Sequence, residues 1–240
     1  MLNALSGQRG IFETFDEARA AARRTGLPSH EDPNQVTLHM ELAKSLRTSD
    51  HPALFWLRAA ADGHGLRVFD FGGNAGNLFY SYGPHLKSLG RLEWTVFDLP
   101  SVAKQGKKIA AERNAEGLSF ASSPSEFRPD QVLLVSGALH YWETSIADFV
   151  RQFPVAPRHI VVNRTPITER VEPFAIVQRT ATCAHPCIVR NAAQLIREFG
   201  SLGYLLVDRW IAPELRVCLP LFPGHSLPHY SGFYFRLENS

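Results

Sequence analysis

From residue 66 onward, short apolar runs alternate with stretches of helix-forming residues. The apolar runs lie at 67–70, 93–98, 118–121, 130–135 and 158–162. The helical stretches between them lie near 77–89, 102–116 and 146–153. Unbroken apolar strands separated by helices are typical of a parallel sheet that helices cover on both faces. The pattern therefore predicts a doubly wound, mostly parallel α/β sheet.

The first 65 residues have a helical pattern instead. Helix-forming residues concentrate at 16–24, 36–46 and 53–61. Asp16 stands ahead of the first stretch and is expected to cap that helix, while Gly26 follows it, as glycine often follows a helix. We therefore expect residues 1–65 to form an N-terminal helical extension.

The C-terminal part predicts a different edge to the sheet. After a less regular segment that follows Asn163, a helix is expected near 191–200. Two strand candidates come next, at 204–208 and 231–236. Strand-rich sequence after a series of βα units indicates an antiparallel pair that closes one edge. Residues 66–240 are thus predicted to form one α/β domain.

Charge and cysteine content argue against several classes of protein. Lys and Arg total 25 and Asp and Glu total 23, so the net charge of +2 is too small for a broadly basic, nucleic-acid-binding surface. The longest uncharged run, 217–235, is interrupted by Pro and Gly, so no membrane span is expected. Three cysteines cannot build a paired framework, which favours a reducing, cytoplasmic location. Oligomeric state stays open.

The loop after the first strand of the sheet is the main candidate site. Its residues are Asp70, Gly72, Gly73, Asn74 and Gly76. Ligands bind doubly wound sheets at the carboxyl ends of the strands, and glycine lets the backbone approach a ligand closely. The dinucleotide fingerprint G-x-G-x-x-G, started at Gly72, needs glycine at positions 74 and 77, where this chain has asparagine. A nicotinamide cofactor is therefore disfavoured.

Asp98 ends the next strand and adds a second acidic group to this candidate site. A carboxylate there can accept hydrogen bonds from both ribose hydroxyls of a nucleoside cofactor. The alternative is that the glycine loop is only a tight turn between strand and helix. The acidic residue at the neighbouring strand end favours a binding site.

These motifs resemble the cofactor-binding half of class I S-adenosylmethionine-dependent methyltransferases. Their template, acidic-x-Gly-x-Gly-x-Gly, is matched at Asp70, Gly72 and Gly76, with Asn74 in place of the middle glycine. Asparagine tolerates a positive φ better than most residues. Residues 133–142, which end in Leu-His-Tyr-Trp, are similar to a segment of small-molecule O-methyltransferases.

A second resemblance concerns the N-terminal residues. The segment 10–18 is similar to a small methyltransferase family often met in bacterial surface-polysaccharide gene clusters. Together the resemblances imply a Rossmann-like methyltransferase fold, S-adenosylmethionine as cofactor, and methyl transfer to a small molecule or a glycan precursor. Oxygen is the expected acceptor atom.

The resemblance also implies which residues bind the cofactor. Carried over by position, they are Asp70, Gly72, Gly73, Asn74, Gly76, Asp98, Leu99, Ser122, Ser136 and Gly137. In this assignment Asp98 would bind the ribose and Leu99 would pack on the adenine. Ser122 or Ser123 stands where many relatives have an acidic residue. Ser136 and Gly137 would pass beside the sulfonium.

His140 is the leading candidate for a general base. It follows the fourth strand directly, and an ordinary histidine pKa of about 6.5 suits proton removal at neutral pH. The alternative is that His140 lines the pocket or caps the strand without moving a proton. His185, between Cys183 and Cys187, invites a metal site, but structural zinc needs four ligands, usually in spaced pairs, so no metal is expected.

A second hypothesis comes from another class of protein. The departure at Asn74 and the lack of an unambiguous base are compatible with a catalytically silent subunit that keeps the methyltransferase fold for binding or assembly. Cofactor binding without turnover would distinguish it from an enzyme.

Overall fold

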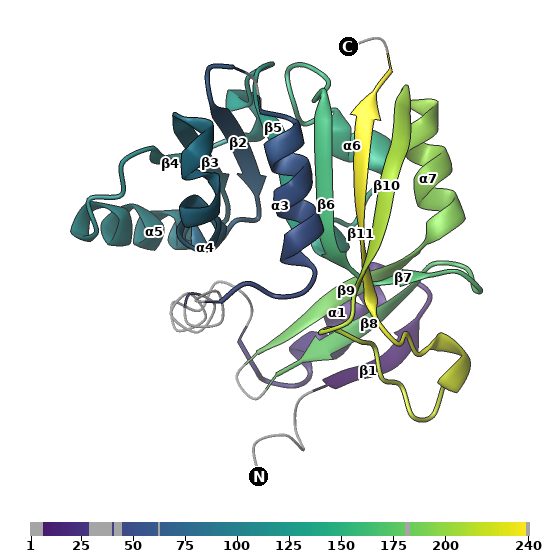
Figure 1. The fold of residues 1–240 in the computed structure, drawn as a ribbon. Coiled ribbons are helices and arrows are strands. Elements are labelled where there is room, and N and C mark those ends of the chain that lie inside the picture. Colours follow the sequence, from purple (N-terminus) through teal and green to yellow (C-terminus); the bar gives the residue numbers. More distant parts are fainter. Residues whose placement is uncertain (1–6, 29–39, 41–44, 62, 181–182, 239–240) are drawn as a thin grey trace.

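The computed structural model describes residues 7–28, 40, 45–61, 63–180 and 183–238. The strands of its larger sheet are β2 (Leu66–Phe71), β3 (Leu92–Phe97), β4 (Leu118–Ala121), β5 (Val132–Ser136), β6 (His159–Thr165), β10 (Tyr204–Ala212) and β11 (Tyr230–Leu237). They lie in the order β10-β11-β6-β5-β2-β3-β4 (Figure 1). The pairs from β6 to β4 are all parallel. The predicted doubly wound sheet is confirmed.

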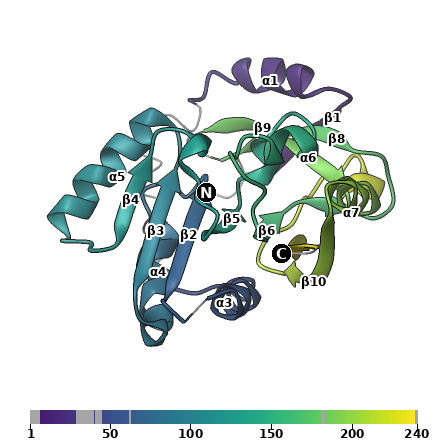
Figure 2. The ribbon, with the colours of Figure 1, turned by 90° about the horizontal axis from the view of Figure 1, so that it is seen from above.

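Helices cover both faces of this sheet. They are α3 (Asp50–Ala59), α4 (Asn77–Leu86), α5 (Pro100–Glu112), α6 (Ile146–Val150) and α7 (Ala192–Ser201). Neighbouring residues of a strand point to opposite faces. Val68 accordingly packs in the core with α3 and α4, and Phe69 packs in the core with α6 and α7. Figure 2 shows the two pairs of helices on opposite sides of the strands.

Short 3-10 turns complete the connections of this domain. They are η2 (Lys87–Leu89), η3 (Pro124–Glu126), η4 (Leu139–Tyr141) and η5 (Pro223–His225). The turn η4 directly follows β5 and therefore holds the residues that leave the carboxyl end of that strand.

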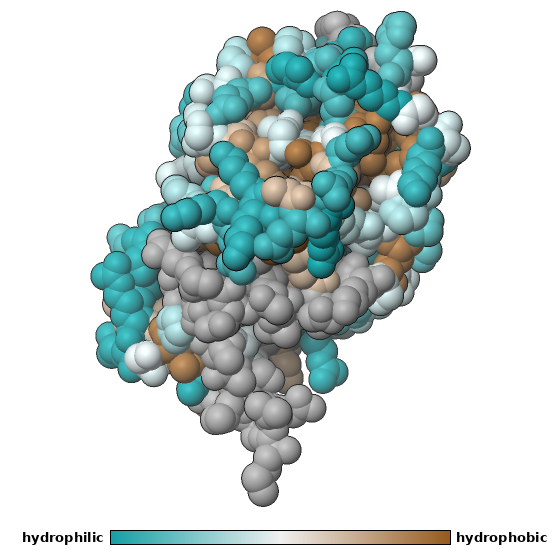
Figure 3. Space-filling view, turned by 90° about the vertical axis from the view of Figure 1, so that its left-hand side faces the viewer, coloured by the Kyte–Doolittle hydropathy of each residue, from teal (hydrophilic) through white to brown (hydrophobic). Residues whose placement is uncertain are grey.

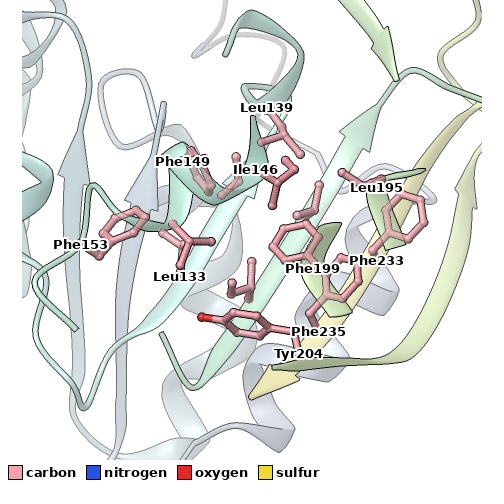
Figure 4. Packing of buried hydrophobic residues seen from close by; sticks show 14 of the residues in the cluster. Leu133, Leu139, Ile146, Phe149, Phe153, Leu195, Phe199, Tyr204, Phe233 and Phe235 are labelled. Carbon is pink, nitrogen blue, oxygen red and sulfur yellow. The ribbon is translucent and has the colours of Figure 1, made fainter. Parts of the chain in front are cut away.

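Aromatic rings fill the core between the sheet and α6 and α7. Phe199 of α7 stacks on Phe235 of β11 with ring centroids 4.1 Å apart, and Phe149 of α6 meets Phe71 of β2 edge-on at 5.0 Å. Figure 4 shows Phe149, Phe199 and Phe235 together with Leu133 of β5 and Leu195 of α7. A fully buried side chain of this kind contributes about 1.5–3 kcal/mol. The strand ends that carry the candidate site therefore lie on a firmly packed sheet.

The antiparallel edge was predicted and is confirmed. β10 pairs antiparallel with β11, and β11 pairs antiparallel with β6. The second pairing contains a β-bulge: Val162 lies opposite Phe233 and Thr165 opposite Ser231, so two residues of β6 face one of β11. One of these two residues, Arg164, has a φ of 55°.

A second, smaller sheet was not predicted. Its strands are β1 (Gly7–Phe12), β7 (Ile167–Thr168), β8 (Phe174–Arg179) and β9 (Ala184–Asn191), in the order β1-β8-β9-β7. It lies next to the larger sheet, at the lower end in Figure 1.

The expectation that residues 1–65 are helical is wrong for β1, which pairs antiparallel with β8. The reason is that β1 is stabilised by a partner more than 150 residues away, which local periodicity cannot show. A domain boundary at residue 65 stays a prediction.

The helix α1 (Phe15–Arg23) is present, but its cap differs from the prediction. Thr14, not Asp16, is the N-cap. Its hydroxyl accepts a hydrogen bond from the Glu17 N–H at 3.2 Å, and the Glu17 carboxylate accepts one from the Thr14 N–H at 3.3 Å. The helix begins at Thr14 because this capping box satisfies two backbone N–H donors, whereas a single cap satisfies one.

The helix predicted at 36–46 lies largely outside the described residues, while that at 53–61 is confirmed as α3.

The face of the molecule that carries α4 and α5 is largely hydrophilic. Figure 3 views the side on which α4 and α5 lie, where polar residues predominate and apolar residues show between them. Lys104, Lys107 and Lys108 are exposed along α5. Within the described part of the chain, no helix is both long enough and apolar enough to cross a membrane.

Candidate functional site

A pocket of about 590 Å³ opens at the carboxyl ends of β2, β3 and β5. Phe71, Phe97 and Ser136 are the last residues of these strands, and all three line the pocket. The lining also includes Gln178 from β8 of the second sheet and Tyr230 from the start of β11. The volume lies within the roughly 300–1,000 Å³ typical of pockets for small molecules and cofactors.

Most of the predicted site residues line this pocket. They are Gly72, Gly73, Asn74, Asp98, Leu99, Ser122, Ser136, Gly137 and His140. The two exceptions are Asp70 and Gly76. Asp70 lies behind Gly73, because a Cβ atom at position 73 would collide with the Asp70 carboxylate. Gly76 starts α4 with a φ of 85°, and a Cβ there would lie 2.8 Å from the Leu118 side chain. Its role is therefore the close approach of helix and strand.

The glycine loop has the geometry that its sequence suggested. Gly72 has a φ of 71°, and a side chain there would collide with Ala138. Asn74 has a φ of 55°, as expected for the non-glycine residue in the template. The Asn74 N–H donates a hydrogen bond to Asp98 Oδ2 at 2.7 Å. This bond ties the loop after β2 to the end of β3.

Asp98 presents a carboxylate at the mouth of this loop. Its Oδ1 accepts a hydrogen bond from the Leu99 N–H at 2.7 Å. Burial raises the pKa of Asp98, and the N–H donors of Leu99 and Asn74 oppose that rise. Each carboxylate oxygen has capacity for a second hydrogen bond. Asp98 can thus accept hydroxyl groups of a ligand while it holds the loop.

Asp70 is a buried carboxyl group directly behind the loop. Burial raises its pKa to about 7, the charge of Asp98 adds to the rise, and a hydrogen bond from Trp94 together with the charge of Arg164 opposes it. Trp94 Nε1 donates to Asp70 Oδ2 at 3.0 Å. Asp70 Oδ1 has no hydrogen-bond partner among the described residues. A cation in the pocket would therefore stabilise the ionised form of Asp70.

His140 lies in the pocket wall, but its predicted base strength is wrong. Burial, together with the smaller effects of the Arg190 charge and of His185, lowers its pKa to about 3. No described residue forms a hydrogen bond with its Nδ1 atom. At neutral pH the imidazole is neutral and binds a proton weakly. These properties suit a hydrogen-bonding group of the wall better than a general base.

The structure adds a charged network that the sequence analysis missed. Arg164 Nη2 lies 3.0 Å from Asp50 Oδ1, and its Nε and Nη2 donate to Ser136 Oγ at 3.2 and 3.0 Å. The Tyr82 hydroxyl donates to the same Asp50 oxygen at 2.5 Å. Arg47, Asp50 and Arg164 all line the pocket. Only Arg164 had a sequence signal, since it follows the apolar run of β6 at its carboxyl end.

Another part of the pocket wall is aromatic and uncharged. The Tyr141 hydroxyl donates a hydrogen bond to Gln178 Oε1 at 2.8 Å. Trp142, Tyr230 and Leu215 also line this part of the pocket. Burial raises the pKa of Tyr141 well above its usual range. This wall can therefore stack on a ring and donate hydrogen bonds, but it supplies no proton acceptor of ordinary strength.

The predicted residue Ser122 lies beside a carboxylate group. Ser122 lines the pocket, and its hydroxyl and N–H both donate to Glu126 Oε1, at 2.6 and 2.7 Å. Glu126 thus brings a carboxylate next to the position where an acidic residue was expected.

On β9, burial raises the pKa of the Cys187 thiol well above its usual range. Within the described part of the chain, no group of three or more His, Cys, Asp or Glu side chains is arranged to hold a metal ion.

Comparisons with known proteins identify the fold. No family model matches the chain, and no curated protein matches it. Among solved structures, it is similar to the 1,6-didemethyltoxoflavin N1-methyltransferase of Burkholderia thailandensis, with 18% identity, a TM-score of 0.51, and coverage of 80% of this chain and 79% of that one.

Two further structures have the same fold. One is the magnesium protoporphyrin IX methyltransferase of Synechocystis PCC 6803 with bound S-adenosylmethionine, with 14% identity, a TM-score of 0.51, and coverage of 83% and 80%. The other is an O-methyltransferase from neocarzinostatin biosynthesis, with 15% identity, a TM-score of 0.53, and coverage of 93% and 68%. The chain has the Rossmann-like fold of S-adenosylmethionine-dependent methyltransferases, as predicted.

Proposed function

We propose that this protein transfers a methyl group from S-adenosylmethionine to a small molecule. The observation that carries the proposal is the joint placement of the glycine loop and Asp98 at the mouth of one pocket. The fold supports it, because the similar structures include methyltransferases crystallised with S-adenosylmethionine or S-adenosylhomocysteine.

The residues of the pocket fit this cofactor. Asp98 would accept the ribose hydroxyls, and Leu99, which is 39% exposed although apolar, offers a surface for the adenine ring. The missing side chains at Gly72 and Gly73 let the loop pack closely on Ala138 and on the buried carboxyl of Asp70. The loop lines the part of the pocket that we assign to the amino-acid part of the cofactor. Asp70 Oδ1 has no hydrogen-bond partner in the part of the chain that the structure describes, and with the charge of Asp98 it makes this part of the pocket favourable for the cofactor's positive groups.

Positioning is the main task of the protein in such a reaction. The bound cofactor supplies a methyl group that its sulfonium already activates. Holding two reactants in line can contribute roughly 7–11 kcal/mol to catalysis. Trp142, Tyr141 and Tyr230 would hold a planar or cyclic acceptor against the cofactor, and Gln178 would orient it through its amide group.

Oxygen is the proposed acceptor atom, on a small molecule or a glycan precursor. The glycan alternative rests on the resemblance of residues 10–18 to a family met in polysaccharide gene clusters. The small net charge of +2 favours a neutral acceptor over a polyanion. Cytoplasmic location remains part of the same proposal, from the low cysteine content.

The second candidate is a catalytically silent protein of the same fold. The low pKa of His140, about 3, favours this alternative for acceptors whose hydroxyl group must lose a proton. The two functions differ in the fate of the cofactor. An enzyme incubated with methyl-labelled S-adenosylmethionine and an extract of its own cells transfers the label to a new compound, whereas a silent subunit leaves the label on the cofactor.

Replacing Asp98 with alanine should lower the affinity for S-adenosylhomocysteine about 100-fold. A hydrogen bond to a charged group contributes about 1.5 kcal/mol or more, and two ribose hydroxyls would lose such a partner. Calorimetric titration of the wild type and the variant measures the change. Asp148→Ala, at an exposed carboxylate on α6, is the control and should leave the affinity unchanged. Equal affinities of wild type and Asp98→Ala, or no binding by the wild type, would contradict the proposal.

A further inference from the structure

The second sheet contributes a polar side chain to the pocket, that of Gln178 on β8. β8 is paired on both edges, with β1 and with β9, so its backbone is held in place. Successive side chains of a strand point to opposite faces. Ala175 and Val177 pack against α1, whereas Ile176 packs with Tyr230. Gln178, two residues beyond Ile176, therefore points to the side of Ile176 and reaches the pocket.

Tyr141 fixes the orientation of the Gln178 amide group. The Tyr141 hydroxyl donates a hydrogen bond to Gln178 Oε1 at 2.8 Å. Burial raises the pKa of Tyr141 well above its usual range, so this hydroxyl keeps its proton and remains a donor. A hydroxyl that donates to the amide oxygen selects one of the two flipped orientations of a glutamine side chain. The Gln178 Nε2 group is therefore left for another partner.

The Gln178 Nε2 group has no hydrogen-bond acceptor in the part of the chain that the structure describes. An amide NH2 group donates two hydrogen bonds and accepts none. The neighbouring wall offers no competing donor from Trp142, because its Nε1 already donates to the Ser145 carbonyl at 3.3 Å. Leu215 adds apolar surface from the cluster that contains Tyr141. Gln178 thus presents N–H donors to a ligand within aromatic and apolar surroundings.

His140 adds a second uncharged polar group beside Tyr141. The centroids of the two rings lie 4.1 Å apart, and His140 is 3% exposed. Its Nδ1 atom has no hydrogen-bond partner among the described residues. Burial is the main cause of its pKa of about 3, so the imidazole carries no charge at neutral pH. A wall made of neutral groups favours an uncharged ligand, because a buried charge would have no opposite charge beside it.

A carbonyl group matches this wall best. Its oxygen accepts up to two hydrogen bonds and brings no proton that needs an acceptor. A hydroxyl group in the same place would bring such a proton, while Gln178 Oε1 is already bonded to Tyr141. We propose that Gln178 selects the methyl acceptor through a hydrogen bond from Nε2 to a carbonyl oxygen of an uncharged cyclic substrate. The assignment of this ligand as methyl acceptor rests on the proposed function, whereas the preference for a carbonyl is a binding property of the wall.

The test uses two ring probes of similar shape, 4-hydroxyacetophenone and 4-isopropylphenol, of which only the first has a carbonyl. Calorimetric titration at neutral pH measures the affinity of each probe, with and without saturating S-adenosylhomocysteine. Gln178→Glu keeps an oxygen acceptor for Tyr141 but loses the amide donors, and Gln178→Leu loses both. Gln152→Glu, at an exposed glutamine outside the pocket, is the matched control. Thermal unfolding of each variant confirms that it is folded.

We expect wild type to bind 4-hydroxyacetophenone about 10-fold more tightly than 4-isopropylphenol, the effect of one hydrogen bond. Both Gln178 variants should lose this preference, and Gln152→Glu should keep it. Equal losses of affinity for the two probes would indicate a purely structural role of Gln178 and overturn the proposal. Wild type that binds the two probes equally, or binds neither, would overturn it as well.

Tyr141→Phe tests whether the phenol orients the amide. Without the hydroxyl, the Gln178 amide can turn either way, so the preference for 4-hydroxyacetophenone should fall while the affinity for 4-isopropylphenol stays the same. An unchanged preference would overturn the orienting role of Tyr141. If wild type binds no S-adenosylhomocysteine, the proposed function fails, and the titrations without that nucleoside still decide whether Gln178 selects a carbonyl.

Discussion

Asp50→Ala should lower the free energy of unfolding by about 3–5 kcal/mol, because it leaves a buried charge without its partner. The Asp50 side chain is 4% exposed and that of Arg164 is 12% exposed, so water cannot replace the lost carboxylate. The Tyr82 hydroxyl, fully buried, loses its acceptor at the same time. Urea unfolding followed by tryptophan fluorescence measures the change.

A double variant distinguishes the lost charge pair from simple loss of packing. Asp50→Ala with Arg164→Met removes both charges and should be more stable than Asp50→Ala alone. Asp16→Ala is the control at an exposed ion pair, with Arg19, and should cost less than about 1 kcal/mol. If Asp50→Ala costs no more than this control, the ion pair does not stabilise the fold.

The main sheet and the glycine loop could be predicted because their signals are local. The strands of the parallel sheet are rich in apolar residues because helices cover both faces of the sheet, and residues 132–135 of β5 form an unbroken apolar run. The loop at Gly72 and Asn74 needs positive φ values, and the residue types at these positions report that need directly. Asp98 follows from the same rule, because the carboxyl ends of neighbouring parallel strands meet at one edge.

The second sheet and the charged network could not be predicted because their partners are far apart in the chain. β1 pairs with β8, and Asp50 pairs with Arg164, across more than 100 residues in each case. The error on His140 has a related cause. A reference pKa describes an imidazole in water, whereas this one is buried beside Arg190 and His185, which come from β9.

Asp70→Asn should make the protein more stable than wild type at pH 8 and similar to it near pH 4. Burial raises the pKa of Asp70 from about 3.8 to about 7 in the folded protein. The folded state therefore binds this proton more tightly than the unfolded chain does. The stabilising effect is fully present below about pH 4 and is lost as the pH rises through 7. A tenfold change in proton affinity is worth about 1.4 kcal/mol, so the total is roughly 4 kcal/mol.

The difference in unfolding free energy between Asp70→Asn and wild type reports on Asp70 alone, because every other titrating group is present in both proteins. Urea unfolding at several pH values from 4 to 8 should show the difference growing with pH and levelling off above about 7. The asparagine oxygen can still accept the hydrogen bond from Trp94 Nε1, which now holds the carboxylate at 3.0 Å. Asp130→Asn, at an exposed carboxylate, is the matched control and should show no comparable growth. A difference that stays constant with pH would contradict the raised pKa of Asp70 and, with it, the proposal that a positive group of the cofactor binds beside this carboxyl.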